Sequence, residues 1–304
     1  MSAALELIQP YLELRSASEN RKPAASVRHT ARQNHLIAAL QPGEYERLLP
    51  DLEPIALPLG WFLHRSGDVE KYLYFPTAGI VSKFYMTESG ASAGFAVTGS
   101  EGMIGIASIL SSERTRTNAV VLSAGHAYRL ATDLVKNEFS FGHPVRQLLM
   151  RYTLALITQV SQTAVCNRHH SVDQQLCRWL LMCLDRLPGN EMPMTHEVIS
   201  SMLGVRREGV SAAAGKLQEE GLIHCGRGRI IVLDRPKLER RACECYGVVI
   251  REYARLLPAM TATLDHHQRT EQCRPLRLEG KEHDCRTFAQ KSSGGAQLSA
   301  CGQE

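Results

Sequence analysis

The sequence contains no long apolar run. Hydrophobic residues make up 44% of its 304 residues, yet no stretch approaches the ~20 consecutive apolar residues that a transmembrane helix needs. The N-terminal segment carries Glu6 and Glu13 and has no apolar run followed by a small-residue cleavage site, so we expect no secretory signal. A membrane is therefore not an expected partner of this chain.

Cysteine is missing from the first half of the chain, where the first one is Cys166. An odd number of cysteines, scattered over the second half, suits a reducing cytoplasm better than a disulfide scaffold. We therefore predict a cytoplasmic protein with free thiols. The nine cysteines are Cys166, Cys177, Cys183, Cys225, Cys243, Cys245, Cys273, Cys285 and Cys301.

A strong excess of one charge is absent as well, because the net charge is only +4. Any affinity for nucleic acid must then come from locally clustered Arg and Lys. No Ser/His/Asp order, phosphate-cradling glycine loop or carboxylate pair stands out, so we predict that the chain is not an enzyme.

The residues from 194 to 233 have the spacing of two helices, a tight corner and a β-ribbon. Thr195 can cap a first helix, and Gly204 can make the corner before a second helix that runs from about Arg206 to Glu220. Gly221 ends this helix, and two short apolar strands follow, joined by a Gly-Arg-Gly tip. The pattern predicts a winged helix-turn-helix. The apolar positions of the second helix are Val210, Ala213, Ala214 and Leu217.

The outward face of the second helix is typical of a helix that enters the DNA major groove. Arg207, Glu208 and Ser211 are the candidate base-reading residues, because an Arg fork fits guanine O6 and N7 and a carboxylate accepts from cytosine N4. Two amphipathic helices joined at a glycine are also a common packing unit, but the basic ribbon tip favours DNA. The candidate phosphate contacts are His196, Arg206, Lys216, Arg227 and Arg229.

This segment resembles the DNA-binding domain of the Crp/Fnr transcription regulators. The resemblance implies that Arg207 and Glu208 read a half-site containing a G·C pair. Ala212 stands where the family often has a third reader, an Arg, so the half-site is expected to be relaxed or shifted there. Arg206 replaces the frequent capping Ser, which suggests a phosphate contact.

Residues 34–143 read as short strands separated by glycines, which predicts a small antiparallel roll or barrel. The roll is similar to the cyclic-nucleotide-binding sensor domain of the same family, and the resemblance covers roughly residues 34 to 236. We therefore expect an α+β fold: an N-terminal antiparallel β-roll, a long dimerisation helix and a C-terminal winged helix-turn-helix.

The resemblance locates a candidate effector pocket at Gly105, Arg116 and Thr117. Ile106 stands where cyclic-nucleotide-binding members have a Glu that holds the ribose, and an aliphatic group cannot accept from a hydroxyl. A cyclic nucleotide is thus a disfavoured alternative, and Arg116 is better interpreted as a solvated strand charge.

We expect no cofactor and no metal. The iron–sulfur members of the family use cysteines of an N-terminal segment, which this chain lacks. A haem would need histidines of the roll as axial ligands, and lone histidines are weak evidence. The pair Cys243 and Cys245, with His224 and Cys225 nearby, is a weak zinc pattern, and a helix with buried thiols explains it as well.

Residues 144–168 form the longest helical pattern, which predicts a dimerisation helix and a homodimer on palindromic DNA with half-sites one helical turn apart. The opposite flank, with Leu148 and Ile157, would pack on the chain's own roll. RNA polymerase is a further candidate partner. The predicted seam residues of the dimer helix are Leu149, Tyr152, Leu156 and Val160.

The remaining boundaries follow from pattern and composition. Residues 1–33 and 259–304 are predicted to be largely disordered, the former with a short helix, while 237–258 form one or two helices. Residues 169–236 form the DNA-binding domain, in which Gln174 and Arg178 are expected to face solvent. The alternative function is a small-molecule sensor that acts through protein contacts without a DNA target.

Overall fold

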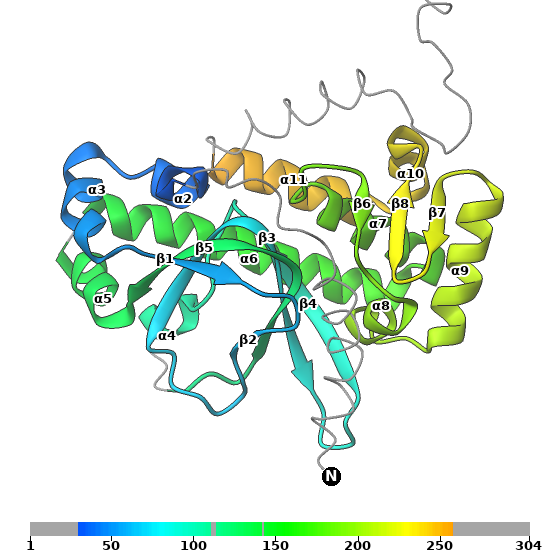
Figure 1. The fold of residues 1–304 in the computed structure, drawn as a ribbon, viewed down its shortest axis with the longest axis horizontal. Coiled ribbons are helices and arrows are strands. Elements are labelled where there is room, and N and C mark those ends of the chain that lie inside the picture. The colour runs from blue at the N-terminus through cyan, green and yellow to red at the C-terminus, as the bar shows by residue number, and fades with distance from the viewer. Residues whose placement is uncertain (1–29, 111–113, 142, 258–304) are drawn as a thin grey trace, which may run out of the picture.

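The computed structural model describes residues 30–110, 114–141 and 143–257. The predicted tail 259–304, and residues 1–29 of the predicted N-terminal extension, lie outside the described residues. Figure 1 shows the large sheet at one end, a smaller winged-helix domain at the other, and α6 running along both. The predicted α+β fold is confirmed.

The first part of the chain, up to residue 141, contains most of the strands. Its elements are η1 Ala31–Gln33, α2 His35–Ala38, α3 Pro42–Leu48, η2 Leu49–Asp51, β1 Glu53–Leu57, β2 Phe62–His64, β3 Tyr72–Met86, β4 Ser92–Thr98, α4 Ile106–Leu110, β5 Asn118–Ala131 and α5 Thr132–Phe141.

The second part consists of α6 and the elements that follow it. They are α6 His143–His169, α7 Val172–Leu184, β6 Glu191–Met192, α8 His196–Leu203, α9 Arg207–Glu219, β7 Ile223–Gly226, β8 Arg229–Val232, α10 Arg235–Arg241 and α11 Glu244–Leu256.

The large sheet is antiparallel, with the strand order β1-β5-β3-β4 and β2 paired to β5. The long strands β3 and β5 shift register where Gly79 and Gly125 meet. A Cβ on Gly125 would lie 2.0 Å from the Ala78 carbonyl oxygen, so only glycine permits this close approach. Leu73 and Tyr74 point to opposite faces, and each face has its own buried apolar cluster.

The C-terminal helix α11 packs mainly along α6 and also contacts α7. The predicted element 237–258 consists of two helices, α10 and α11. Helix α11 packs against α6 more extensively than against the DNA-binding domain. Tyr253 and Val249 supply its buried side. No helix among the described residues combines the length and apolar character needed to cross a membrane.

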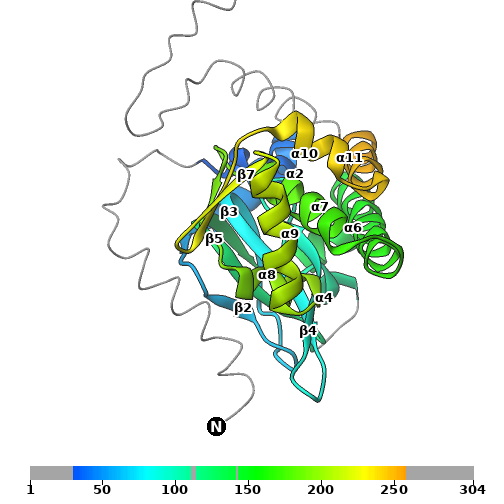
Figure 2. The ribbon, with the colours of Figure 1, turned by 90° about the vertical axis from the view of Figure 1, so that its right-hand side faces the viewer.

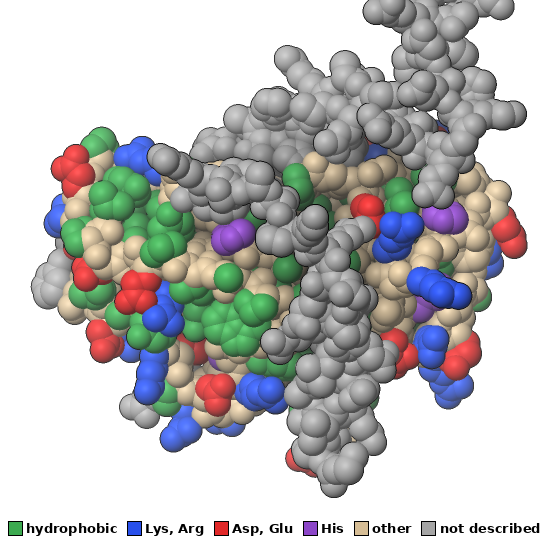
Figure 3. Space-filling model, in the orientation of Figure 1, with side chains coloured by type: hydrophobic (Ala, Val, Ile, Leu, Met, Phe, Trp, Pro, Cys, Tyr) green, Lys and Arg blue, Asp and Glu red, His purple; other side chains and the backbone are tan. Residues whose placement is uncertain are grey.

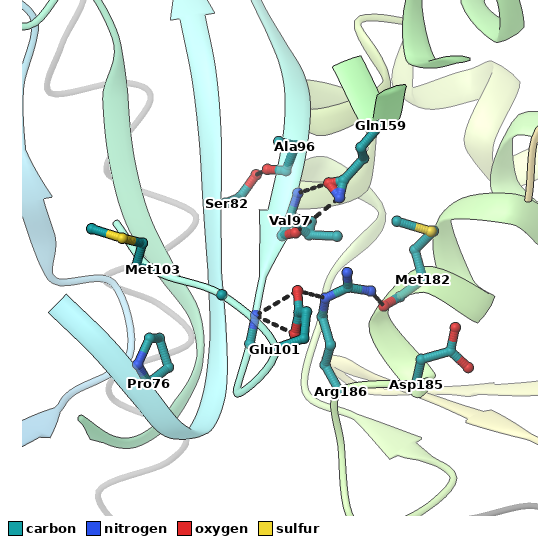
Figure 4. Close-up of polar contacts among 12 residues, drawn as sticks. Pro76, Ser82, Ala96, Val97, Glu101, Met103, Gln159, Met182, Asp185 and Arg186 are labelled. Atoms are coloured by element: carbon teal, nitrogen blue, oxygen red, sulfur yellow. Dashed lines mark hydrogen bonds and ion pairs between the residues drawn. The ribbon is translucent and has the colours of Figure 1, made fainter. Parts of the chain in front are cut away.

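Polar contacts hold the winged-helix side and α6 against the sheet, and Figure 4 draws those of Gln159 and Arg186. The Gln159 amide of α6 accepts from Val97 N at 3.2 Å and donates to Val97 O at 3.1 Å, which satisfies the edge strand β4. The Arg186 Nε donates to Glu101 Oε1 at 2.8 Å, from the loop after α7 to the loop after β4. Ser82 Oγ donates to Met202 Sδ at 3.1 Å.

Candidate nucleic-acid interface

The two helices of the predicted motif have the expected ends. Thr195 caps α8, because its side chain accepts from Val198 N at 3.2 Å. Gly204 ends α8 with a φ of 66°, the left-handed conformation that a tight corner requires. The four predicted core residues of α9, among them Val210 and Leu217, are at most 1% exposed. The predicted winged helix-turn-helix is confirmed by this architecture.

The outward face of α9 is clear of the described remainder of the chain (Figure 2). Arg207, Glu208 and Ser211 are exposed there. Arg207 Nε lies 3.6 Å from Glu197 Oε2, and these two side chains are 66% and 46% exposed, so the pair leaves the guanidinium accessible. Ser211 Oγ shares a hydrogen bond of 3.1 Å with His196 Nδ1. The face offers an Arg fork and a carboxylate side by side.

The wing is a three-stranded sheet with the order β6-β8-β7. The sequence predicts only β7 and β8, because a strand as short as β6 leaves no alternation to recognise. Arg227 is exposed at the tip, beside Gly228 with a φ of 68°. Arg229 Nη1 lies 3.6 Å from Glu191 Oε1. A phosphate would therefore compete with the Glu191 carboxylate for the Arg229 guanidinium.

The other candidate phosphate contacts differ in their exposure, their ion pairs and their charge. Arg206 is exposed just before α9 and makes no side-chain cap. Lys216 Nζ lies 3.2 Å from Asp173 Oδ2. Burial, and then the charge of Arg207, lower the pKa of His196, so it is neutral at neutral pH and offers a hydrogen bond rather than a charge. Figure 3 shows Lys and Arg side chains interspersed with acidic ones at the winged-helix end of the molecule.

A buried polar network lies inside the roll, and the sequence did not indicate it. His64 Nδ1 is 2.9 Å from Glu70 Oε1, and their side chains are 6% and 5% exposed. His64 Nε2 also shares a hydrogen bond of 3.3 Å with Thr117 Oγ1. A cavity of about 300 Å³ opens beside His64, Glu70 and Tyr72. His64 and Thr117 are 53 residues apart in the chain, so only the folded roll brings them together.

The three predicted effector-pocket residues have different surroundings. Gly105 is buried against Leu73, where a Cβ would lie 2.7 Å from a methyl carbon. The Arg116 side chain is exposed, in keeping with a solvated strand charge. Thr117 alone joins the buried network. Ile106 packs in the main apolar core and is 6% exposed.

We expect the pH dependence of stability to reveal the buried Lys83. Burial lowers its pKa from 10.5 to about 8, although the charge of Glu70 opposes this. Between about pH 8 and 10.5 the unfolded chain keeps a proton that the folded chain has lost, so the free energy of unfolding rises with pH through this window. Lys83→Met should therefore stabilise the protein by about 1–3 kcal/mol at pH 7, with a smaller gain at pH 10.

Urea unfolding at both pH values measures this gain. Lys71→Met is the matched control, because Lys71 is exposed. A gain from Lys83→Met that is the same at pH 7 and pH 10, or a loss at pH 7, would contradict the assignment.

The long helix α6 confirms the predicted span of 144–168 but corrects its predicted seam. Leu149, Tyr152 and Leu156 are 4%, 0% and 8% exposed within their own chain, and Val160 is partly buried against the same core. They pack on the roll and on α11, so they are unavailable to a partner. Ile157, expected to face the roll, is 55% exposed.

A different apolar row of α6 remains exposed. Met150, Leu154, Ile157 and Val165 are 54%, 44%, 55% and 44% exposed, and their spacing of three, four or eight residues puts them on one side of the helix. We name these four residues the exposed row. Both sides of α6 are apolar, which is why the sequence pattern did not separate the internal face from the external one.

Comparison with known proteins shows which domain and which solved structures this chain resembles. Residues 174–241 match the family model of the Crp-like helix-turn-helix domain. No curated protein matches the chain. The described fold is similar to those of solved structures, with sequence identities below 20% for the three given next.

A Crp/Fnr-family transcriptional regulator from Eubacterium rectale has 19% identity and a TM-score of 0.56, over 67% of this chain and 96% of that one. FixK2 from Bradyrhizobium japonicum has 16% identity and a TM-score of 0.55, over 63% and 98%. The regulator CLP from Xanthomonas campestris, described as responsive to c-di-GMP, has 18% identity and a TM-score of 0.53, over 63% and 99%.

Residues 174–241 are thus a Crp-like helix-turn-helix domain, the class of domain that the geometry of α8, α9 and the wing defines. The fold of the described chain is shared with solved regulators of the Crp/Fnr family.

Proposed function

We propose that this regulator binds palindromic DNA as a homodimer and that a signal at the β-roll controls the binding. The observation that carries the proposal is the free outward face of α9, where Arg207 and Glu208 are exposed side by side. Arg207 would bond guanine, Glu208 would accept from cytosine N4, and Ser211 would contact a neighbouring base edge. Phosphate contacts would come from His196, Arg206, Lys216, Arg227 and Arg229.

The exposed row supports the homodimer. Four large apolar side chains on one helix face are costly in water, and a second copy of α6 would bury them symmetrically. Packing through Met150, Leu154 and Ile157 leaves the internal contacts of Tyr152 undisturbed, since that residue lies on the other side of α6. A two-fold pair of α9 helices then fits half-sites one helical turn apart.

The contact between β4 and α8 is a direct route from the roll to the DNA-binding helices. Ser92 Oγ donates to Ser201 O at 3.2 Å, and a Cβ on Gly94 would lie 2.9 Å from Met202 O, so the strand and the helix touch at backbone distance. A ligand in the cavity beside His64 that moves β3 and β4 would therefore tilt α8 and α9. Asp68 and Glu70 line this cavity together with Lys71 and His64, so its lining carries groups of both signs.

Selection from a pool of random duplexes tests the proposed site. We expect the purified full chain to enrich a two-fold-symmetric sequence with half-site centres about 10 base pairs apart, because the dimer presents two equivalent helices. Enrichment of a single half-site would contradict the dimeric reading. No enrichment at all would favour the second candidate function, a sensor that acts through protein contacts.

A further inference from the structure

Four metal-ligating side chains from two distant parts of the chain meet where α6 ends and α11 begins. Cys166 lies in the last turn of α6 and His170 directly follows that helix, with its backbone N–H donating to Cys166 O at 3.0 Å, while Cys243 and Cys245 flank the first residue of α11. Their sulfur and nitrogen ligand atoms all lie within 4.8 Å of one another. The three cysteines are buried as a cluster of their own, separate from the apolar core.

Two of the six distances among these ligand atoms match a single tetrahedral ion, and the other four are at most 4.8 Å. Zn–S bonds of about 2.3 Å and Zn–N bonds of about 2.0 Å place two sulfurs about 3.8 Å apart and a sulfur and a nitrogen about 3.5 Å apart. Cys166 Sγ lies 3.5 Å from Cys243 Sγ, and Cys245 Sγ lies 3.6 Å from His170 Nδ1. A disulfide needs about 2.05 Å between its sulfurs, so the thiol pair is not at bonding distance.

The surroundings of the cluster also suit a metal. His170 Nε2 lies 3.4 Å from Glu244 Oε1, so a carboxylate can hold the imidazole while Nδ1 faces the thiols. Arg178, predicted to face solvent, is instead 5% exposed, and it lies close enough to the Cys166 and Cys245 thiols for its charge to act on both. Its Nη2 donates to Thr163 at 2.6 Å, while its Nε has no hydrogen-bond partner among the described residues.

We propose that Cys166, His170, Cys243 and Cys245 bind one Zn²⁺ in a closed structural site. Three thiolates and an imidazole are a common zinc ligand set, and four protein ligands leave no open position for catalysis. The three thiolates and the ion sum to a charge of −1, which Arg178 offsets. This proposal differs from the expectation, made from the sequence, that the chain binds no metal. Of the weak zinc pattern in the sequence it uses only Cys243 and Cys245, and neither His224 nor Cys225.

The zinc site would fix the hinge of the regulator. His170 lies between α6, which ends at His169, and α7, which begins at Val172, so it belongs to the link between the long helix and the DNA-binding domain. Binding Cys243 and Cys245 to the same ion would clamp α11 across that link. Loss of the metal would then loosen α11 first.

Metal analysis of the reduced full chain, purified without a histidine tag, tests the proposal. We expect one zinc per chain, and the same content after Cys273→Ser, Cys285→Ser and Cys301→Ser together, or after the matched control Cys225→Ser. When Cys243→Ser or Cys245→Ser is added to the triple variant of Cys273, Cys285 and Cys301, the zinc should be lost. Glu244→Gln should keep the site but weaken zinc binding about tenfold in a chelator competition.

Cobalt substitution keeps the test decisive if a cysteine variant fails to fold. The wild-type chain loaded with Co²⁺ should show the intense visible bands of a tetrahedral ion and a thiolate charge-transfer band. The proposal is overturned if reduced wild type binds neither zinc nor cobalt in this way. Zinc retained by a folded Cys243→Ser or Cys245→Ser variant would overturn it equally.

Discussion

Replacing Arg186 with methionine should lower the free energy of unfolding by about 3–5 kcal/mol, because it leaves a buried carboxylate without its partner. The side chains of Arg186 and Glu101 are 2% and 4% exposed. Arg186 also donates to the Met182 carbonyl, and Glu101 accepts from Gly99 N at 3.0 Å. Burial lowers the pKa of Arg186, but the negative charges nearby, first that of Glu101, raise it by more, so the pKa of Arg186 is raised overall.

Urea unfolding of three variants and the wild type measures this effect. Glu101→Gln combined with Arg186→Met should recover part of the stability, because the double variant buries no unpaired charge. The exposed pair Arg47 and Glu138 provides the control Arg47→Met, for which we expect no measurable change. If Arg186→Met costs no more than this control, the buried pair does not hold the two domains together.

Placing a charge on the exposed row should dissociate the proposed homodimer. Ile157 is 55% exposed in the single chain, so Ile157→Glu is tolerated by the fold but would bury two glutamates against each other in the dimer. We expect the variant to sediment as a monomer. Its affinity for a palindrome should fall by on the order of 10²-fold or more, because the two recognition helices no longer bind as one unit.

A matched control separates dimer loss from a general effect of the charge. Leu49 is 47% exposed on η2, away from α6, so Leu49→Glu should leave both the sedimentation and the DNA affinity unchanged. A dimeric Ile157→Glu variant that still binds the palindrome would contradict the assigned seam.

Local signals explain which features could be predicted from the sequence. The cap at Thr195, the corner at Gly204 and the helical spacing of Val210 and Leu217 are decided by neighbours in the chain, and all appear in the structure. The roll was recognisable because glycines separate its strand-like segments, although β3 and β5 proved to be long strands of 15 and 14 residues. The bend at Gly125 could not be foreseen, since it depends on contact with Ala78, 47 residues earlier.

The misplaced features depend on contacts between distant segments. The seam of α6 was assigned to Tyr152 because both faces of the helix are apolar, and only the packed roll and α11 decide which face is internal. Arg178 was expected in solvent because a charge is rarely buried, but Thr163 accepts its hydrogen bond. The proposed zinc ligands Cys166 and Cys243 are 77 residues apart, a separation that no spacing motif covers.

Fluorescence anisotropy on the selected palindrome and on a scrambled duplex, over a range of salt concentrations, tests the central claim most directly. Arg207→Ala should lose about 1–3 kcal/mol of preference for the palindrome and keep the wild-type salt slope, because a base contact is removed. Arg227→Ala is the matched control, which should weaken both duplexes equally and reduce the slope by about 1. If Arg207→Ala keeps the full preference, α9 does not read the bases and the account is wrong.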